Sequence, residues 1–299
     1  MRYGSSMSTP IQNTISRTAH AKVNLALAVD RADPASGLHP ICSWVHAIDL
    51  GDTVTVERAD ESSYSVRRQD SGRVDWAVED DLAVRAHLAI EQASGRSLPV
   101  NLTVVKHTPA GGGLGGGSSD AASVLMMVNE LYELNLGEAE LRAIAGTLGS
   151  DVHFFVDPVS FREERAPGAA LVSGFGDLVE RRSCESMPIT LIVPPFGCST
   201  AAVYSAFDRL SPGPFSAGAV QELAAEILDD TSALFNDLAG PAMEVEPRLG
   251  EIHRALTEGL GRAVHVSGSG STLFVLGRVD ADEAMRLSPG VRVIETALV

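Results

Sequence analysis

The sequence contains little cysteine, fewer basic than acidic residues and no long apolar segment. Its three cysteines, Cys42, Cys184 and Cys198, have no paired spacing, which fits free thiols in a reducing compartment and offers no zinc framework. Its eight histidines form no cluster of the His-Glu-x-x-His kind, so we expect no transition-metal site. The formal net charge of −16 argues against nucleic acid or an anionic membrane as a partner.

The lack of a membrane-spanning or targeting pattern limits the location. No apolar run approaches the length that crosses a bilayer, and residues 1–20 are polar, without the apolar core of a signal peptide. We therefore expect a cytoplasmic protein with no membrane partner. The 299 residues, 44% hydrophobic and 21% charged, suffice for one large or two ordinary globular domains.

The most informative segment is Pro109–Asp120, which has six glycines in the seven positions 111–117. Residues without side chains bury no apolar surface, so this segment is not part of a core. A strand pattern at 101–105 precedes it, and an apolar stripe with helical spacing follows it. The residues of that stripe are Ala121, Val124, Leu125, Val128, Leu131 and Tyr132. A glycine loop at the positive end of a helix presents bare N–H groups, so we predict a phosphate-binding loop rather than a flexible linker.

Three familiar phosphate-binding loops do not fit this segment. A Walker loop needs a lysine after its last glycine, and here Ser118 follows Gly117. The dinucleotide fingerprint needs an acidic residue at the end of a second strand, whereas Glu130 and Glu133 fall inside the helix pattern. The loop of protein kinases needs His-Arg-Asp and Asp-Phe-Gly segments, and the chain has neither.

The remaining patterns predict both strands and helices. Expected strands cover residues 22–29, 41–56, 64–66, 171–179 and 189–193. Expected helices cover residues 82–92, 138–148, 221–228 and 247–257, the second of them stopped by Gly149. Expected turns or loops cover residues 33–37 and 211–215. We divide the chain into a polar tail (1–13), an N-terminal domain (14–165) that contains the phosphate-binding loop, and a C-terminal domain (166–299).

Three motifs in order resemble those of the GHMP kinases, a family named after galactokinase, homoserine kinase, mevalonate kinase and phosphomevalonate kinase. The segment Pro109–Ala122 resembles the second motif, Ala21–Leu25 the first and Val266–Thr272 the third. The motifs are spread from residue 21 to residue 272, so the resemblance extends over almost the whole chain. The resemblance implies a two-domain α+β kinase with its active site in the cleft between the domains.

Three further segments resemble one branch of this family. They are Ser36–His39, Asp49–Asp52 and Thr147–Val152. That branch uses ATP to phosphorylate the 2-hydroxyl of 4-diphosphocytidyl-2-C-methyl-D-erythritol in the non-mevalonate isoprenoid pathway. Two alternatives stay open: a family member that acts on homoserine, mevalonate or a sugar, and a nucleotide-binding regulatory protein without catalysis. The second alternative would be expected to lack Lys22 or Asp151, and both are present.

The resemblance implies two catalytic residues, Lys22 and Asp151. Strand alternation places Lys22 and Asn24 on one face, opposite the apolar side. Without the resemblance, Lys22 would be interpreted as an exposed lysine and Asp151 as a helix cap. With it, Asp151 is expected to accept the proton of the alcohol, while Lys22 stabilises charge on the attacking oxygen.

The resemblance also implies ATP and Mg²⁺ as cofactors. The residues expected to bind ATP are Pro109, Gly111, Gly112, Gly113, Gly115, Gly116, Gly117, Ser118 and Ser119. Ser119 or a neighbouring hydroxyl could orient Mg²⁺, but the sequence does not choose the metal ligands. Lys106 either reaches the nucleotide or is a solvated strand end.

The residues expected to bind the small-molecule substrate are Asn24, His39, Thr200, Tyr204, Gly268, Ser269 and Gly270. The resemblance implies that His39 reads the cytosine edge and that Thr200 and Tyr204 lie by the ribose and the base. It also implies that a second glycine loop, Gly268–Ser271, approaches the substrate diphosphate or the transferred phosphoryl group. Two residues depart from the family pattern, because Leu38 and His153 stand where tyrosine and proline are usual. An aromatic ring lost at position 38 would weaken stacking on the cytosine. The sequence leaves the oligomeric state open.

Overall fold

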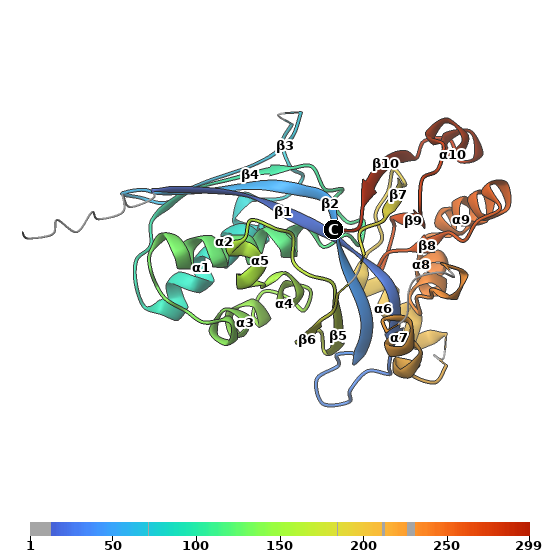
Figure 1. Ribbon diagram of the computed structural model, residues 1–299, viewed down its shortest axis with the longest axis horizontal. Helices are drawn as coiled ribbons and strands as arrows, with labels where there is room; N and C mark the ends of the chain where they lie inside the picture. Colours follow the sequence, from blue (N-terminus) through green and yellow to red (C-terminus); the bar gives the residue numbers. More distant parts are fainter. Residues whose placement is uncertain (1–12, 71, 184, 211–212, 226–230) are drawn as a thin grey trace, which may run out of the picture.

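The computed structural model describes residues 13–70, 72–183, 185–210, 213–225 and 231–299. In this part of the chain two antiparallel-rich sheets lie side by side, and the helices pack in separate groups against them (Figure 1). One sheet combines strands β1 to β6 in the order β3-β4-β2-β5-β6, with β1 paired to β2. The other has four strands in the order β10-β7-β9-β8. None of the helices in the described ranges is long and apolar enough to cross a membrane.

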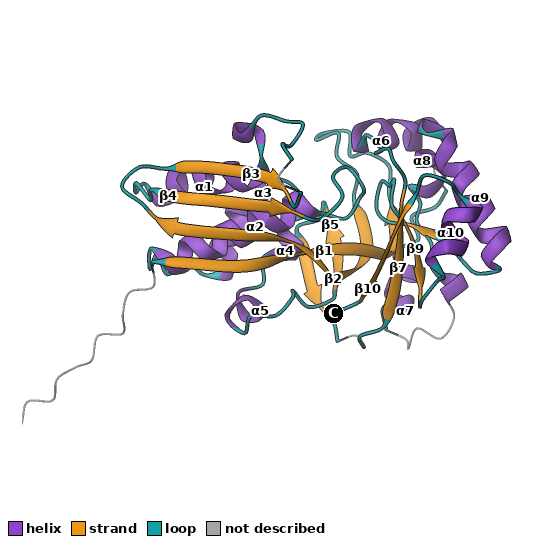
Figure 2. Ribbon diagram, turned by 90° about the horizontal axis from the view of Figure 1, so that it is seen from above, coloured by secondary structure: helices purple, strands orange, loops and turns teal. Residues whose placement is uncertain are grey.

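The strands β1 (Thr14–Val29) and β2 (Ile41–Arg58) run through both halves of the molecule (Figure 2). They pair along nearly their whole length, with register shifts after His20 and after Asn24. The C-terminal part of β2 pairs with β4, and its N-terminal part pairs with β5. The paired strands β1 and β2 therefore extend from the first half of the molecule into the second. The residues of β1 that follow His20 lie in the region where the two halves meet.

The first half is a sheet with helices on one face, as Figures 1 and 2 show. Its core joins apolar side chains of the strands to those of α2, for example Val54 and Leu102 to Leu125 and Met127. Its further elements are β3 (Ser63–Arg68), η1 (Val78–Asp80), α1 (Leu82–Ser94), β4 (Val100–Lys106), α2 (Gly116–Leu131), α3 (Glu138–Gly146), α4 (Val152–Phe155), α5 (Pro158–Arg162), β5 (Ala170–Gly174) and β6 (Leu178–Arg181).

The second half packs its helices against the four-stranded sheet and against the ends of β1 and β2. Its elements are β7 (Pro188–Val193), α6 (Thr200–Arg209), α7 (Ala217–Leu223), η2 (Thr231–Ala233), α8 (Ala239–Val245), α9 (Pro247–Leu260), β8 (His265–Val266), β9 (Leu273–Leu276), α10 (Ala281–Leu287) and β10 (Arg292–Ala297). Leu27 and Val29 of β1 belong to the core of this half, so one strand contributes to both halves.

Most predicted elements are present, with different ends. The expected strands near residues 22–29 and 64–66 are the longer β1 and β3, and the expected helix at 82–92 is α1. The helix expected to end at Gly149 ends at Gly146 instead. Thr147 and Leu148 donate their N–H groups to Ile144 and Ala145 in a tighter turn, so the chain leaves the helix before the glycine. The single strand expected near 171–179 is the hairpin β5–β6.

Two expectations fall partly outside the described residues. The helix expected at 221–228 overlaps α7, which begins earlier and ends at Leu223, while residues 226–230 are not described. The loop expected at 211–215 includes the undescribed residues 211 and 212. The tail at 1–13 lies outside the described residues except for Asn13. The strands β5 and β6 follow residue 166 and pair with the first sheet, so the chain changes sheet between Arg181 and Pro188, whereas the domain division at 166 stays a prediction.

Candidate active site

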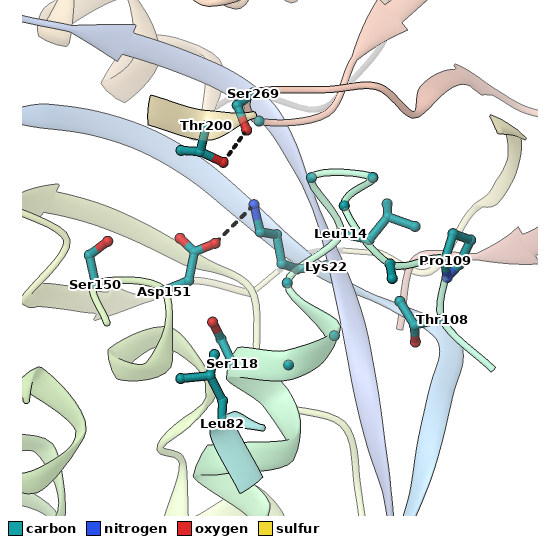
Figure 3. A pocket seen from close by; sticks show the side chains of 18 of the residues that line it. Lys22, Leu82, Thr108, Pro109, Leu114, Ser118, Ser150, Asp151, Thr200 and Ser269 are labelled. Carbon is teal, nitrogen blue, oxygen red and sulfur yellow. Dashed lines mark hydrogen bonds and ion pairs between the residues drawn. The ribbon is translucent and has the colours of Figure 1, made fainter. Parts of the chain in front are cut away.

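A cavity of about 550 Å³ lies where the two halves of the molecule meet. Both glycine-rich loops, the middle of β1 and the start of α6 contribute to its walls (Figure 3). The residues predicted from the sequence that line it are Lys22, Asn24, Lys106, Pro109, Gly111, Gly112, Gly113, Gly115, Gly116, Gly117, Ser118, Asp151, Thr200, Tyr204, Gly268 and Ser269. Residues up to 247 positions apart in the sequence, from Lys22 to Ser269, thus face one space.

The first glycine loop joins β4 to α2, as its sequence predicts. Gly111, Gly113 and Gly115 have φ angles of 68°, 74° and 68°, the left-handed region that residues with a side chain avoid. Gly115 is the N-cap of α2 and has no side chain to bond the first N–H groups of the helix. The positive end of α2 therefore faces the cavity with N–H groups free to hold an anion.

The two glycine loops contact each other directly. The backbone N–H of Thr272 donates to the carbonyl of Gly112 at 3.2 Å, and the hydroxyl of Ser267 donates to the carbonyl of Gly113 at 3.1 Å. A Cβ atom at Gly113 would lie 2.2 Å from the carbonyl oxygen of Ser267. The close approach of the loops therefore depends on the absence of a side chain at position 113.

We expect Gly113→Ala to weaken binding of a non-hydrolysable ATP analogue by about tenfold or more, because a displacement near 1 Å in a binding site has effects of this size. The added methyl group collides with Ser267 and disfavours the positive φ. Isothermal titration of the folded variant measures the change. The matched control is Gly218→Ala in α7, where a Cβ has no heavy atom within 4 Å. Equal affinities for the two variants would contradict this account of the loop.

Lys22 and Asp151 face each other across the cavity (Figure 3). Lys22 Nζ lies 3.5 Å from Asp151 Oδ2 and donates a hydrogen bond of 2.5 Å to Asn24 Oδ1. Asn24 donates in turn to the hydroxyl of Ser43 at 2.8 Å. Lys22 is 3% exposed, and the side chain of Asp151 is 51% exposed. The hydrogen bond confirms the predicted common face of Lys22 and Asn24. Lys22 and Asp151 together combine a buried, fixed cation with a carboxylate that is open to a ligand.

The position of Asp151 bears on its interpretation as a helix cap. Asp151 is the N-cap residue of the short helix α4, but its side chain makes no capping hydrogen bond. Its carboxylate is directed towards Lys22 instead (Figure 3). This arrangement supports the catalytic interpretation over the capping one, while the role itself stays a prediction.

Lys106 is buried, so its interpretation as a solvated strand end is wrong. Its ammonium forms ion pairs with Asp52 and Asp120, whose side chains are fully buried. Although burial by itself lowers the pKa of Lys106, the carboxylates of Asp120 and Asp52 raise it above its ordinary value. The sequence alone gave no sign that Asp52 and Asp120 share this cation.

The residues predicted for the nucleoside side lie near α6. The hydroxyls of Thr200 and Ser269 are 2.9 Å apart, which joins the start of α6 to the second glycine loop. The rings of Tyr204 and His39 have centroids 4.9 Å apart, and His39 Nε2 lies 2.9 Å from Asp208 Oδ1. Tyr204 lines the cavity, whereas His39 does not line it and contacts the ring of Tyr204. Burial, reinforced by the charge of Asp151, raises the pKa of Tyr204 to about 12, so its phenol is neutral at ordinary pH.

Three predicted residues do not line this cavity: His39, Ser119 and Gly270. Ser119 is the fourth residue of α2, and the turn of the helix after Ser118 directs it to a different, smaller cavity of about 230 Å³. Ser118 faces the active-site cavity instead.

One wall of the cavity was not predicted from the sequence. It is formed by Trp76, Asp80, Asp81 and Leu82 at the start of α1. An aspartate directly before a helix pattern was the available signal, and Asp81 does cap α1.

No group of three or more His, Cys, Asp or Glu side chains in the described residues could hold a metal ion. Mg²⁺ is often bound by one or two carboxylates together with substrate phosphates. A serine hydroxyl at the phosphates can also hold this ion, and the hydroxyl of Ser118 lines the cavity. This side chain fits a metal ion that arrives with a nucleotide.

The fold and the cavity define the class of protein. Residues 81–157 match the model of the GHMP kinases N terminal domain. The crystal structure of a homoserine kinase from Cytophaga hutchinsonii has the same fold, with a TM-score of 0.64 at 17% identity, over 100% of this chain and 97% of that chain. Residues 81–157 therefore carry a GHMP kinase N-terminal domain, and the whole chain has the fold of that kinase structure.

More similar relatives define the branch. A 4-diphosphocytidyl-2-C-methyl-D-erythritol kinase from Persephonella marina is 33% identical over 284 residues, which are 93% of this chain and 97% of the relative. One from Streptomyces avermitilis is 36% identical over 88% of each chain. A crystal structure of 4-(cytidine 5'-diphospho)-2C-methyl-D-erythritol kinase has a TM-score of 0.72 at 31% identity, over 95% of this chain and 99% of that one. The chain belongs to the 4-diphosphocytidyl-2-C-methyl-D-erythritol kinase family.

Proposed function

We propose that this chain transfers the γ-phosphoryl group of ATP to the 2-hydroxyl of 4-diphosphocytidyl-2-C-methyl-D-erythritol. The observation that carries the proposal is the 3.5 Å contact of Lys22 Nζ with Asp151 Oδ2 in a cavity lined by both glycine loops. The relatives' names supply the identity of the alcohol.

The chemistry follows from the placement of the two charges. The carboxylate of Asp151 receives the hydroxyl proton as the substrate oxygen bonds to the γ-phosphorus, and the bond from that phosphorus to the β–γ bridging oxygen breaks. ADP leaves with the electron pair of the broken bond. The ammonium of Lys22, held by Asn24, stabilises the negative charge that develops on the attacking oxygen.

ATP binding is assigned to the first glycine loop and the N-terminus of α2. The loop brings backbone N–H groups close to the phosphates, and the helix dipole favours their negative charge. The net charge of −16 makes such local donors necessary, since the overall field of the protein repels a polyphosphate. Mg²⁺, bound with ATP, would neutralise part of the phosphate charge, and the side chain suited to hold it is Ser118.

The direct test is transfer of radiolabelled γ-phosphate from ATP to the cytidyl-diphosphate substrate by the purified protein. We expect one labelled product and one ADP for each substrate consumed. Free methylerythritol, homoserine and mevalonate are the comparison alcohols, and each should be a far poorer acceptor. Transfer to one of these alcohols at an equal or higher kcat/KM would overturn the proposed substrate.

We expect Tyr204→Ala to raise the KM of the cytidyl-diphosphate substrate by about 5- to 150-fold, the equivalent of the roughly 1–3 kcal/mol that stacking of a base on an aromatic ring contributes. The KM of ATP should change by less than about threefold. Tyr204→Phe is the control, because it keeps the ring and removes only the hydroxyl. Steady-state kinetics with each substrate varied in turn measures both constants. An unchanged substrate KM in Tyr204→Ala would remove this residue from nucleoside recognition.

A further inference from the structure

We propose that Lys106 is a positioning residue for the ATP loop: it ties the start of the loop to its end through Asp52 and Asp120, and it does not contact ATP. This inference rests on the proposed use of the first glycine loop for ATP. It concerns a buried cluster of charges that the phosphoryl transfer itself does not use.

The cluster joins three elements around one ammonium group. Lys106 is the last residue of β4, Asp52 lies in β2 and Asp120 lies in the second turn of α2. Lys106 Nζ is 2.5 Å from Asp120 Oδ2 and forms a second ion pair with Asp52 Oδ2. Both aspartates are 0% exposed. The strand before the glycine loop and the helix after it are thus held by the same cation.

Asp52 also fixes the first residues of the loop. Its Oδ1 accepts the backbone N–H groups of His107 and Thr108 at 2.5 and 2.7 Å. A Cβ at Gly116, the first residue of α2, would lie 2.9 Å from Thr108 Cγ2 and 3.3 Å from Asp52 Oδ2. The two ends of the loop therefore pack on each other directly above the cluster.

The charges of the cluster explain why the ammonium is not free for a ligand. Two buried carboxylates share one cation, and each would be left unpaired if Lys106 turned into the cavity. Burial raises the pKa of Asp120 well above its usual range, and the charge of Lys106 offsets this only in part. Asp120 Oδ1 has no hydrogen-bond partner among the described residues. Withdrawing the lysine to bind phosphate would leave both buried side chains without their cation, so it is unfavourable.

The residue type fits this role. The chain contains only two lysines, Lys22 and Lys106, and all its other basic side chains apart from histidine are arginine. A compact ammonium can contact two carboxylates from different directions, whereas the flat, wider guanidinium of arginine prefers to bind one carboxylate in a fork.

The first experiment measures the affinity of a non-hydrolysable ATP analogue by calorimetry, without the alcohol substrate. We expect Asp120→Leu, of similar size but without an acceptor, to weaken analogue binding by about tenfold or more. Asp120→Asn keeps an oxygen for Lys106 and should stay within about threefold of the wild type. The alcohol KM should change by less than about threefold in both variants, whereas a general loss of folded structure would affect both ligands. Wild-type analogue affinity in folded Asp120→Leu would overturn the proposal.

A double variant separates positioning from direct contact. If Lys106 acts only through the cluster, Lys106→Met/Asp120→Leu should bind the analogue no more weakly than Asp120→Leu alone. A further loss of about tenfold in the double variant would show direct contact with ATP and overturn the proposal. The double variant leaves the buried carboxylate of Asp52 without its cation, so a melting curve must show that it is folded before its affinity is compared.

A wild-type measurement makes the test independent of folding. An ATP derivative with a reactive acyl group on its γ-phosphate transfers that group to lysines at the phosphates. We expect mass spectrometry to find no label on Lys106, and label on Lys106 would overturn the proposal. Because the analogue affinities and the labelling do not involve the alcohol, they remain interpretable if the cytidyl-diphosphate substrate proves to be wrong.

Discussion

Asp151→Asn should lower kcat by about 10²- to 10⁴-fold, because general-base catalysis contributes factors of this size. The amide has nearly the shape of the carboxylate and keeps an oxygen towards Lys22, so the cavity and its contents should be unchanged. What it loses is the capacity to accept the proton of the alcohol. We therefore expect kcat to fall while the affinity for a non-hydrolysable ATP analogue stays within about threefold of the wild type.

The matched control for this substitution is Asp280→Asn. Asp280 caps the helix α10 by accepting the N–H of Glu283, and asparagine is an equally good cap. This variant should have the kinetics and melting temperature of the wild type. Near wild-type turnover of a folded Asp151→Asn protein would exclude Asp151 as the base. A loss of ATP-analogue binding as large as the loss of turnover would instead assign Asp151 to nucleotide binding.

The sequence was most informative where one local pattern determines both structure and chemistry. A strand pattern, a run of glycines and an apolar stripe predicted β4, the loop and α2, because each of these patterns depends on nearby residues only. The common face of Lys22 and Asn24 followed from strand alternation alone, and their hydrogen bond confirms it. The pairing of Lys22 with Asp151 rested on the resemblance to the GHMP kinases, since 129 positions separate them.

The structure differs from the sequence predictions where a residue's surroundings come from distant segments. Lys106 could be a nucleotide ligand or a solvated lysine on local grounds, and only the fold brings Asp52 and Asp120 to its ammonium. Ser118 and Ser119 are equivalent in sequence, but the helix that begins at Gly116 directs them to different cavities. The strands after residue 166 join the first sheet by pairing with β2, a contact over more than 120 positions that no local pattern encodes.

Lys22→Met should lower kcat by about 10²- to 10³-fold, the loss that follows removal of one preorganised electrostatic contact to the transition state. Methionine fills the space of the lysine stem, so the buried strand should keep its packing. Lys22→Arg should also be strongly impaired, although it keeps the charge. The ammonium lies 2.5 Å from Asn24 Oδ1 in a nearly closed position, where the wider guanidinium does not fit.

The double variant Lys22→Met/Asp151→Asn decides whether the two residues act as a unit. Groups that serve one step together give strongly non-additive losses, so the double variant should be only slightly slower than the slower single variant. Steady-state kinetics on the two single variants and the double variant completes the cycle, and a melting curve for each confirms that it is folded. If the two losses instead multiply, Lys22 and Asp151 contribute independently. Their 3.5 Å contact would then reflect proximity in the cavity rather than a shared role in transferring the phosphoryl group.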